Sequence, residues 1–292
     1  MADRADLEEN ARRVMESESL SASLALAKEI RNNIDMRIKM RRENIAGLEF
    51  APGVFSVASY NIHKYVGIDG VFAPERIARV IRELKADIVG LQEIDSSFYR
   101  KGNLGGQMLE KAGLELILGP TRRNRHGHYG NALLTACQVK DVRRIDLSVF
   151  GRSPRGALDV DLLVKGETIR VIVAHLGLGL RERRKQIRRL MDIFCSERDR
   201  LEIMLGDFNE WVPFGSPLCR VHDFFGKSPT LRTFPSLMPV LPLDRIWIRP
   251  MDALASISTH KTPLSRKASD HLPVKAFIVP GVKTDGNGCR CG

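Results

Sequence analysis

The residues best suited to chemistry follow a short apolar run in the last third of the chain. Gly206-Asp207-Phe208-Asn209 comes directly after Ile203-Met204-Leu205, a run typical of a buried strand. Polar side chains at the end of a strand face open space, where carboxylate and amide oxygens can bind a hard cation or orient a water molecule. Glycine followed by aspartate also ends many strands without any function, so this motif alone decides nothing.

Similar polar residues stand at the ends of five other apolar runs. Each has an ordinary explanation as a turn or capping residue, but together they are of the types that bind Mg²⁺ and move protons. Loops at one edge of a fold can bring such residues together. The sequence therefore predicts one catalytic face that contains, besides Asp207 and Asn209, the residues Asn61, Glu93, His175, Asp244, Asp270 and His271.

The elements that must position these residues are mostly strands. Apolar runs predict strands over 54–60, 87–91, 114–118, 132–135, 158–164, 169–175, 202–205, 245–248 and 272–279. Helices are expected from Pro74 to about Leu84, and over 181–195, where apolar residues follow the spacing of a core-facing stripe. Because strands outnumber helices and do not alternate strictly with them, the pattern favours an α+β sandwich over a doubly wound parallel sheet.

The helix over 181–195 also carries a dense group of basic residues. These are Arg183, Arg184, Lys185, Arg188 and Arg189. These residues either form a stripe that contacts the phosphates of a bound partner or, as we expect, are an ordinary solvated outer face of the helix.

A different pattern marks residues 1–50. Apolar residues from Leu20 to Ile38 recur at three- and four-residue spacing, which predicts an amphipathic helical extension with an acidic start and a basic end. Its apolar stripe needs a cover, which is the chain's own domain, a second copy or an anionic membrane surface. We expect the extension to be dispensable for chemistry, the main domain to span 51–280, and 281–292 to be a flexible tail.

Bulk composition limits the partners and the compartment. With 46 Lys and Arg against 35 Asp and Glu, the formal net charge is +11, which favours an anionic partner. No segment has the pattern of a signal peptide or a membrane-spanning helix. Five cysteines, an odd and scattered number, indicate a reducing compartment. We therefore expect a cytoplasmic protein.

The ordered set SYNIH, LQEID, YGNALLT, VAHLGL, GDFNE, LDRI and SDHLP resembles the successive motifs of the endonuclease/exonuclease/phosphatase superfamily, over residues 54–279. The combination GDFNEW, TFPS and LDRIWI is most similar to a bacterial subgroup with poorly defined substrates. The resemblance implies a DNase I-like, four-layer α/β/β/α sandwich. It also implies hydrolysis of a phosphate ester with Mg²⁺ or Mn²⁺.

The resemblance also implies roles for single residues. Glu93 is similar to the principal metal ligand, with Asn61 beside it and Asp270 contacting or supporting the same site. Asp207 resembles the residue that orients or deprotonates the attacking water, and Asn209 the one that holds the scissile phosphate. His271 is similar to the catalytic histidine that Asp244 orients, and His175 to a second histidine. Asn131 and Arg155 fall where related enzymes place phosphate contacts or site-supporting groups.

Three functions stay open at this point. The leading one is a metal-dependent phosphodiesterase acting on nucleic acid, whose phosphates the basic surface would contact. A lipid or inositol phosphoesterase is the alternative, because the same site would serve it. A non-catalytic scaffold that binds anions is the third. His63, in place of a family aspartate, and the His175-Leu176 motif both argue against abasic-site repair; His63 itself is interpreted as a loop residue.

Overall fold

The computed structural model describes residues 53–95, 114–124, 127–194, 200–211 and 217–280. The expected helical extension over 1–50 and the tail over 281–292 lie outside the described residues. Residues 125 and 126 do so as well.

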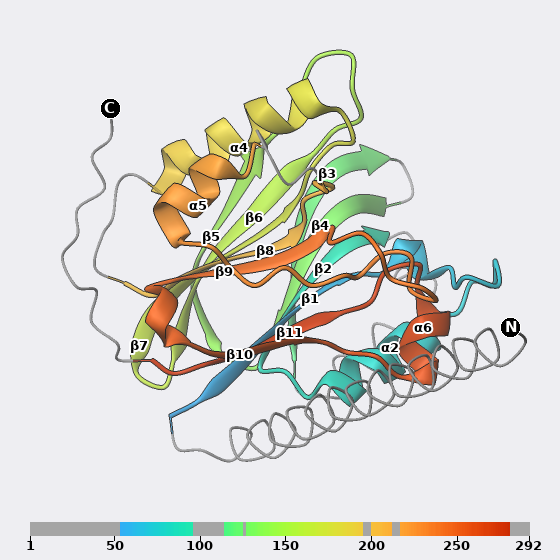
Figure 1. Cartoon of the computed structure of the whole chain (residues 1–292), viewed down its shortest axis with the longest axis horizontal. Helices are drawn as coiled ribbons and strands as arrows, with labels where there is room; N and C mark the ends of the chain where they lie inside the picture. Colours follow the sequence, from blue (N-terminus) through green and yellow to red (C-terminus); the bar gives the residue numbers. More distant parts are fainter. Residues whose placement is uncertain (1–52, 96–113, 125–126, 195–199, 212–216, 281–292) are drawn as a thin grey trace, which may run out of the picture. The chain divides into compact units, whose positions relative to one another are not determined.

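Two mixed sheets form the body of the domain (Figure 1). The first has the strand order β10 (Leu254–Thr259), β11 (Val274–Ile278), β1 (Phe55–Asn61), β2 (Ile88–Asp95), β4 (Gly127–Thr135), β3 (Glu115–Asn124). The second has the order β5 (Gln138–Asp146), β6 (Gly156–Val164), β7 (Glu167–His175), β8 (Glu202–Asp207), β9 (Asp244–Arg249). Each sheet contains one parallel pair, β1 with β2 and β7 with β8.

The sheets pack face to face and enclose the main core. Val57 of one sheet and Val173 and Leu205 of the other belong to this buried cluster. Glycine is required at position 90, because a Cβ there would lie 2.1 Å from Cδ1 of Leu205. The two sheets therefore pack closely at Gly90, where no side chain fits between β2 and β8.

Helices cover the outer face of each sheet. α2 (Pro74–Leu84) packs its buried stripe against β1 and β2, with the short α6 (Pro263–Ala268) beside it. α4 (Leu180–Phe194) and α5 (Cys219–Phe225) pack on β7, β8 and β9. These layers confirm the sandwich expected from the sequence, and both predicted helices are present. None of the helices in the described ranges is long and apolar enough to span a membrane.

Some elements escaped sequence analysis for a physical reason. β5 and β10 lie at sheet edges and are largely unburied, so neither shows the apolar run of a core strand. α5 and α6 are too short for a helical period. The predicted outer face of α4 is wrong at Arg183, which is only 2 % exposed, because that side chain turns inward to a buried acid.

Strand direction gathers the polar residues at one edge. Parallel β1 and β2 both end there, as do parallel β7 and β8. β9 and β11 run antiparallel to their neighbours and so begin at the same edge. In the register, Asp207 stands opposite His175 on one side and Asp244 on the other. The strand ends singled out in the sequence therefore meet.

Candidate active site

A buried histidine and aspartate form the innermost pair of the site. Asp244 begins β9, and His271 lies on the loop that leads into β11. Nδ1 of His271 lies 2.8 Å from Oδ2 of Asp244. The ring of Phe234 packs on the imidazole, with 4.9 Å between centroids. These contacts fix the ring and leave Nε2 directed to the centre of the site, 3.9 Å from Oδ2 of Asp207.

The charge of His271 follows from these neighbours. Burial alone lowers the pKa of His271, but the negative charges of Asp244 and Asp207 and the hydrogen bond to Asp244 outweigh it and raise that pKa to about 10. The imidazole is therefore cationic at neutral pH, with a proton on Nε2. A cationic donor in this position can stabilise negative charge on a phosphate oxygen.

Asp207 lies at the centre of the cluster. Nδ2 of Asn61 donates to its Oδ2 over 3.0 Å, and the backbone N–H of Asn209 donates to its Oδ1 over 3.0 Å. Burial raises the pKa of Asp207 to about 6, although the charge of His271 works against this rise. The carboxyl therefore exchanges its proton close to neutral pH, as a group that activates water must.

The turn after Asp207 needs special backbone geometry. Gly206 has φ 149°, and a Cβ there would lie 1.8 Å from the carbonyl oxygen of Ala174. Asn209 has φ 50°, in the left-handed region, and its Nδ2 donates to the carbonyl of Leu176 over 3.0 Å. Glu210 then accepts from Nε of Arg183 over 3.0 Å, with both side chains buried. This ion pair anchors the turn to α4.

The second histidine has a defined tautomer. Nη1 of Arg155 lies 3.2 Å from Nδ1 of His175. Because a guanidinium only donates, Nδ1 accepts and the ring proton is on Nε2. Burial and the charges of Arg155 and His271 hold the pKa of His175 well below its usual value, so the ring is neutral. Its Nε2 lies 3.5 Å from Oδ2 of Asp207 and presents the N–H to that carboxylate.

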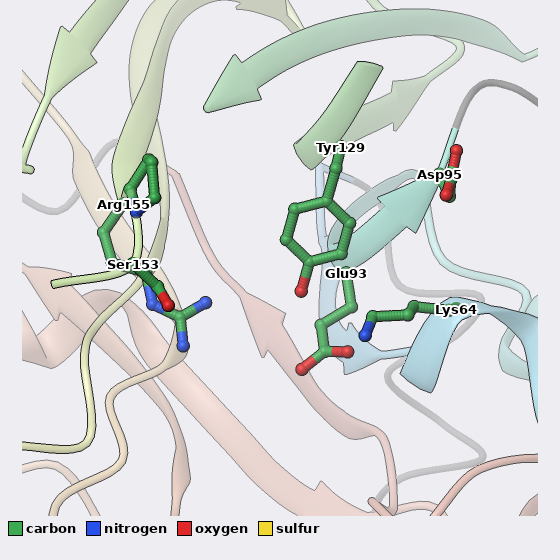
Figure 2. A pocket seen from close by; sticks show the side chains of 7 residues that line it. Lys64, Glu93, Asp95, Tyr129, Ser153 and Arg155 are labelled. Atoms are coloured by element: carbon green, nitrogen blue, oxygen red, sulfur yellow. The ribbon is translucent and has the colours of Figure 1, made fainter. Parts of the chain in front are cut away.

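Glu93 lies at the floor of an open pocket beside this cluster. The register of β2 against β4 shifts between Leu91 and Ile94, and Glu93 at this bulge has φ 60°. A bulge redirects a side chain, here into a pocket of about 480 Å³. Figure 2 shows the carboxylate of Glu93 next to the hydroxyl of Tyr129 and the amine of Lys64, with Arg155 facing it from across the pocket.

Asn61 lies beside Glu93 in the sheet and is linked to Asp270 through Ser269 and His63. Asn61 pairs with Gln92 in the register of β1 and β2, so Glu93 follows immediately. Oγ of Ser269 donates to the carbonyl of Asn61 over 2.8 Å and lies 3.3 Å from Oδ1 of Asp270. His63 lies between them: its N–H donates to Oδ1 of Asn61, and its Nδ1 is 3.6 Å from Oδ1 of Asp270.

Two groups of side chains have the chemistry to hold a metal. The buried ligand atoms of Asp207, Asp244 and His271 lie within 4.8 Å of one another, and Oδ1 of Asp244 has no hydrogen-bond partner among the described residues. However, a protonated His271 bonded to Asp244 has no free lone pair for a cation. The other group, Glu93, Asn61 and Asp270, offers oxygen donors, which suit Mg²⁺ or Mn²⁺, and Glu93 of this group lines the open pocket. We favour this second group.

Asn131 occupies a different place from the other predicted site residues. Its Nδ2 donates to the carbonyl of Gly156 over 2.8 Å and lies 3.3 Å from that of Val173. With 1 % exposure, it ties β4 to the second sheet and does not line the pocket. This position fits the site-supporting role better than a direct contact with substrate.

Five pocket residues were missed in the sequence: Lys64, Asp95, Tyr129, Ser153 and Pro154. Tyr129 precedes Asn131 by two residues, so strand alternation places both on one face and was a usable signal. Burial and the charge of Glu93 raise the pKa of Tyr129, which keeps its hydroxyl protonated. Lys64 lies in the short 3-10 helix His63–Tyr65 and Ser153 on a loop, and the sequence pattern fixes the position of neither segment.

Solved structures share this fold. An endonuclease/exonuclease/phosphatase from Bacteroides vulgatus matches with a TM-score of 0.63 and 17% identity, covering 77% of this chain and 98% of that one. D. rerio TDP2 complexed with a single strand DNA product matches with a TM-score of 0.58 and 18% identity, covering 77% of this chain and 98% of that one. At these identities the similarity shows the fold alone.

Relatives in sequence support a closer relationship. Escherichia coli (strain K12) YbhP, whose name describes it as uncharacterized, is 29% identical over 251 residues, which are 77% of this chain and 96% of that protein. The model of the Endonuclease/Exonuclease/phosphatase family matches residues 58–271. The matched span runs from β1 to His271 and so includes all the site residues described above. The chain belongs to the endonuclease/exonuclease/phosphatase family.

Proposed function

We propose that this protein hydrolyses phosphodiester bonds with the help of a divalent cation, Mg²⁺ or Mn²⁺. The observation that carries the proposal is the position of Asp207. Its carboxylate lies between the cationic His271, the neutral His175 and Asn61. Asn61 ends β1, which pairs with β2, the strand that carries Glu93. A carboxylate that exchanges its proton near neutrality beside a fixed cationic donor is the arrangement that attack of water on a phosphate requires.

Each residue then has a distinct role. Asp207 orients the attacking water and accepts its proton. Nε2–H of His271 donates to a phosphate oxygen as negative charge builds there, with Asp244 holding the ring. The amide of Asn209 uses one N–H for Leu176 and keeps the second for the phosphate. Arg155 holds the tautomer of His175 and presents its remaining N–H groups to the pocket.

The cation would be held by Glu93, with Asn61 and Asp270 beside it. When bound, it would supply positive charge to the phosphate oxygens and so lower the barrier to attack. The cation-dependent chemistry of the proposal rests on this donor group.

The substrate within the phosphodiester class is a separate question. Nucleic acid, the leading prediction from sequence, draws support from the net charge of +11 and from the fold shared with a protein complexed with single strand DNA. Neither feature distinguishes one phosphodiester from another. A purely scaffolding role is disfavoured, because Glu93, Asp207, Asn209 and His271 are all present at one edge.

Turnover of bis(p-nitrophenyl) phosphate tests the activity without assuming a natural substrate. We expect hydrolysis by the full chain with Mg²⁺ or Mn²⁺, loss of it in EDTA, and recovery when the cation is returned. Undiminished turnover in EDTA contradicts the proposal.

Calorimetric titration with Mn²⁺ distinguishes the two donor groups independently of activity. We expect Glu93→Gln to lose most of the Mn²⁺ affinity and Asp244→Asn to keep it. Glu167→Gln is the matched control, because Glu167 is an exposed residue at the far end of β7. If Asp244→Asn abolishes binding and Glu93→Gln does not, the cation belongs to the buried group instead.

A further inference from the structure

Exposed large apolar side chains are concentrated on one edge of the domain. Ten of the eleven in the described residues lie on segments 62–73, 147–155, 176–180, 208–211 and 233–243. The most exposed are Phe150 at 105%, Met238 at 73% and Leu178 at 68%. The eleventh, Val279, follows β11 at the opposite end of the sandwich. Single exposed apolar residues are ordinary, but such a concentration marks an interaction surface.

These five segments are the loops that carry the active site, and we call them the apolar rim. They adjoin Asn61, Arg155, His175, Asp207 and Asp244 in turn. In Figure 1 the loops after β1 and β7 and before β9 lie on the same side of the sandwich. An occupant of the rim therefore covers the pocket of Glu93. Such an occupant either blocks the reaction or carries the substrate.

The charges of the rim select an anionic occupant. Its cations are Lys64, Arg152 and Arg155. Its acidic residues, Asp69 and Glu210, are each paired with an arginine, at 3.0 Å from Arg76 and at 3.0 Å from Arg183. Segments 176–180 and 233–243 contain no charged residue at all. The five segments thus combine apolar loops with a net positive charge, although Lys64 and Arg155 also face Glu93 in the pocket. Surfaces that bind anionic membranes have this combination of apolar and basic side chains.

Most of the exposed rim side chains are aliphatic, which bears on the choice between nucleic acid and lipid. Proteins that hold single strands stack bases on aromatic rings and follow the phosphates with cations. Leucine, methionine and valine at Leu178, Leu237, Met238 and Val240 offer no stacking face but gain free energy in an acyl-chain environment. A bilayer also carries phosphodiesters in its polar headgroups. Loops that insert into its surface would bring these headgroups to the pocket that the loops surround.

Resting on the proposed function, we infer that the apolar rim docks on an anionic phospholipid bilayer and that the substrate is a phosphodiester of a membrane lipid headgroup. Water attacks phosphorus, a phosphorus–oxygen ester bond breaks, and the proton taken from the water ends on the released alcohol. The products are a phosphate monoester and an alcohol, and no further reactant is needed.

Tryptophan fluorescence gives a direct test of docking. The chain has two tryptophans: Trp211 on the rim is 45% exposed, and Trp247 is fully buried. The full chain is mixed with vesicles of phosphatidylglycerol and phosphatidylcholine in equal amounts, with bromine on the acyl chains. We expect quenching of Trp211, none in Trp211→Phe, and weaker quenching with phosphatidylcholine alone.

Substitutions then separate docking from chemistry. Phe150→Ser with Met238→Gln removes two rim side chains that touch no catalytic group. We expect partition onto the mixed vesicles to fall about tenfold or more, while bis(p-nitrophenyl) phosphate is hydrolysed at the unchanged rate. Val279→Asn is the matched control, because it removes an exposed apolar side chain away from the rim, and it should change neither property.

Several outcomes overturn the inference and leave the proposed function standing. One is vesicle binding that survives the double substitution without quenching of Trp211, which places the membrane contact elsewhere in the chain. A second is a dimer that the same substitutions dissociate. A third is cleavage of DNA or RNA with no release of phosphate ester from vesicles. Loss of turnover on the soluble diester in wild-type protein would instead remove the proposed function itself.

Discussion

β8 carries a buried carboxylate at each end, and the two belong to very different clusters. At the catalytic end, Asp207 is surrounded by His175, His271 and Asn61. At the other end, Glu202 lies 3.6 Å from Arg170 and 3.5 Å from Arg249. Asp159 completes that second cluster with hydrogen bonds from Arg170 and Arg143.

The two carboxylates differ in the basic side chains around them, which are arginines at Glu202 and histidines at Asp207. Arginine stays protonated at every accessible pH, and hydrogen bonds to Arg170 and Arg143 overcome the effect of burial and lower the pKa of Asp159. Arg143, Arg170 and Asp159 are therefore fixed charges that join β5, β6 and β7, whereas burial raises the pKa of Glu202 beside them. Histidine can change its charge, so the catalytic cluster can take up and release protons during a reaction. Similar burial therefore serves structure at one end and chemistry at the other.

The largest effect is expected from Asp207→Asn. Removing a positioned carboxylate that activates water should lower kcat by about 10²–10⁴-fold, with an unchanged circular dichroism spectrum. Glu202→Gln, at the other end of the same strand, should leave kcat on bis(p-nitrophenyl) phosphate unchanged. Equal losses in both variants would show that the two ends do not differ in function.

Asp244→Asn should lower the rate by about 100-fold or more and also change the pH dependence of stability. His271 has a pKa of about 10 in the folded protein against 6.5 without its partners. A raised histidine pKa stabilises the fold fully below about pH 6.5 and loses this effect as the pH rises through about 10. The difference in Tm between wild type and variant should therefore shrink over this range. A constant difference contradicts the charged pair.

Arg170→Met should reverse the pattern, with a loss of stability and no loss of chemistry. It leaves Asp159 and Glu202 buried without their shared cation, which should lower the free energy of unfolding by about 3–5 kcal/mol. Turnover per folded molecule should stay unchanged. Arg188→Met on the exposed face of α4 is the control and should change stability by less than about 0.5 kcal/mol. Urea unfolding measures both.

Glu202→Gln should have the smallest effect and a characteristic sign. Burial raises the pKa of Glu202 to about 7 from 4.5, although Arg170 and Arg249 oppose the rise. The folded state then holds its proton more tightly than the unfolded state, so ionisation costs stability as the pH rises from about 4.5 to about 7. The variant should melt above wild type at about pH 8, with a smaller gain at about pH 5. A lower Tm at about pH 8 would show that the arginines determine the charge of Glu202.

The sequence by itself indicated which polar residues stand at the strand ends that meet at one edge. Asn61, Asp207 and Asp244 stand at the ends of apolar runs, and an apolar run of this length predicts a buried strand. The helix at Pro74–Leu84 was equally visible, because its start signal and its stripe are local. The relation of β1 to β8 was not visible, and neither was any distance between strand ends.

Tertiary structure decided what these residues do to one another. Arg183 looked like one more surface cation of α4 until the turn at Glu210 gave it a buried partner. The tautomer of His175 depends on Arg155, which is far from it in sequence and reaches it only through the pairing of β6 with β7. The apolar rim likewise comes from five separate segments. Periodicity records the burial of each segment alone, whereas pKa values, tautomers and surfaces depend on distances between segments, which strand order and sheet packing set.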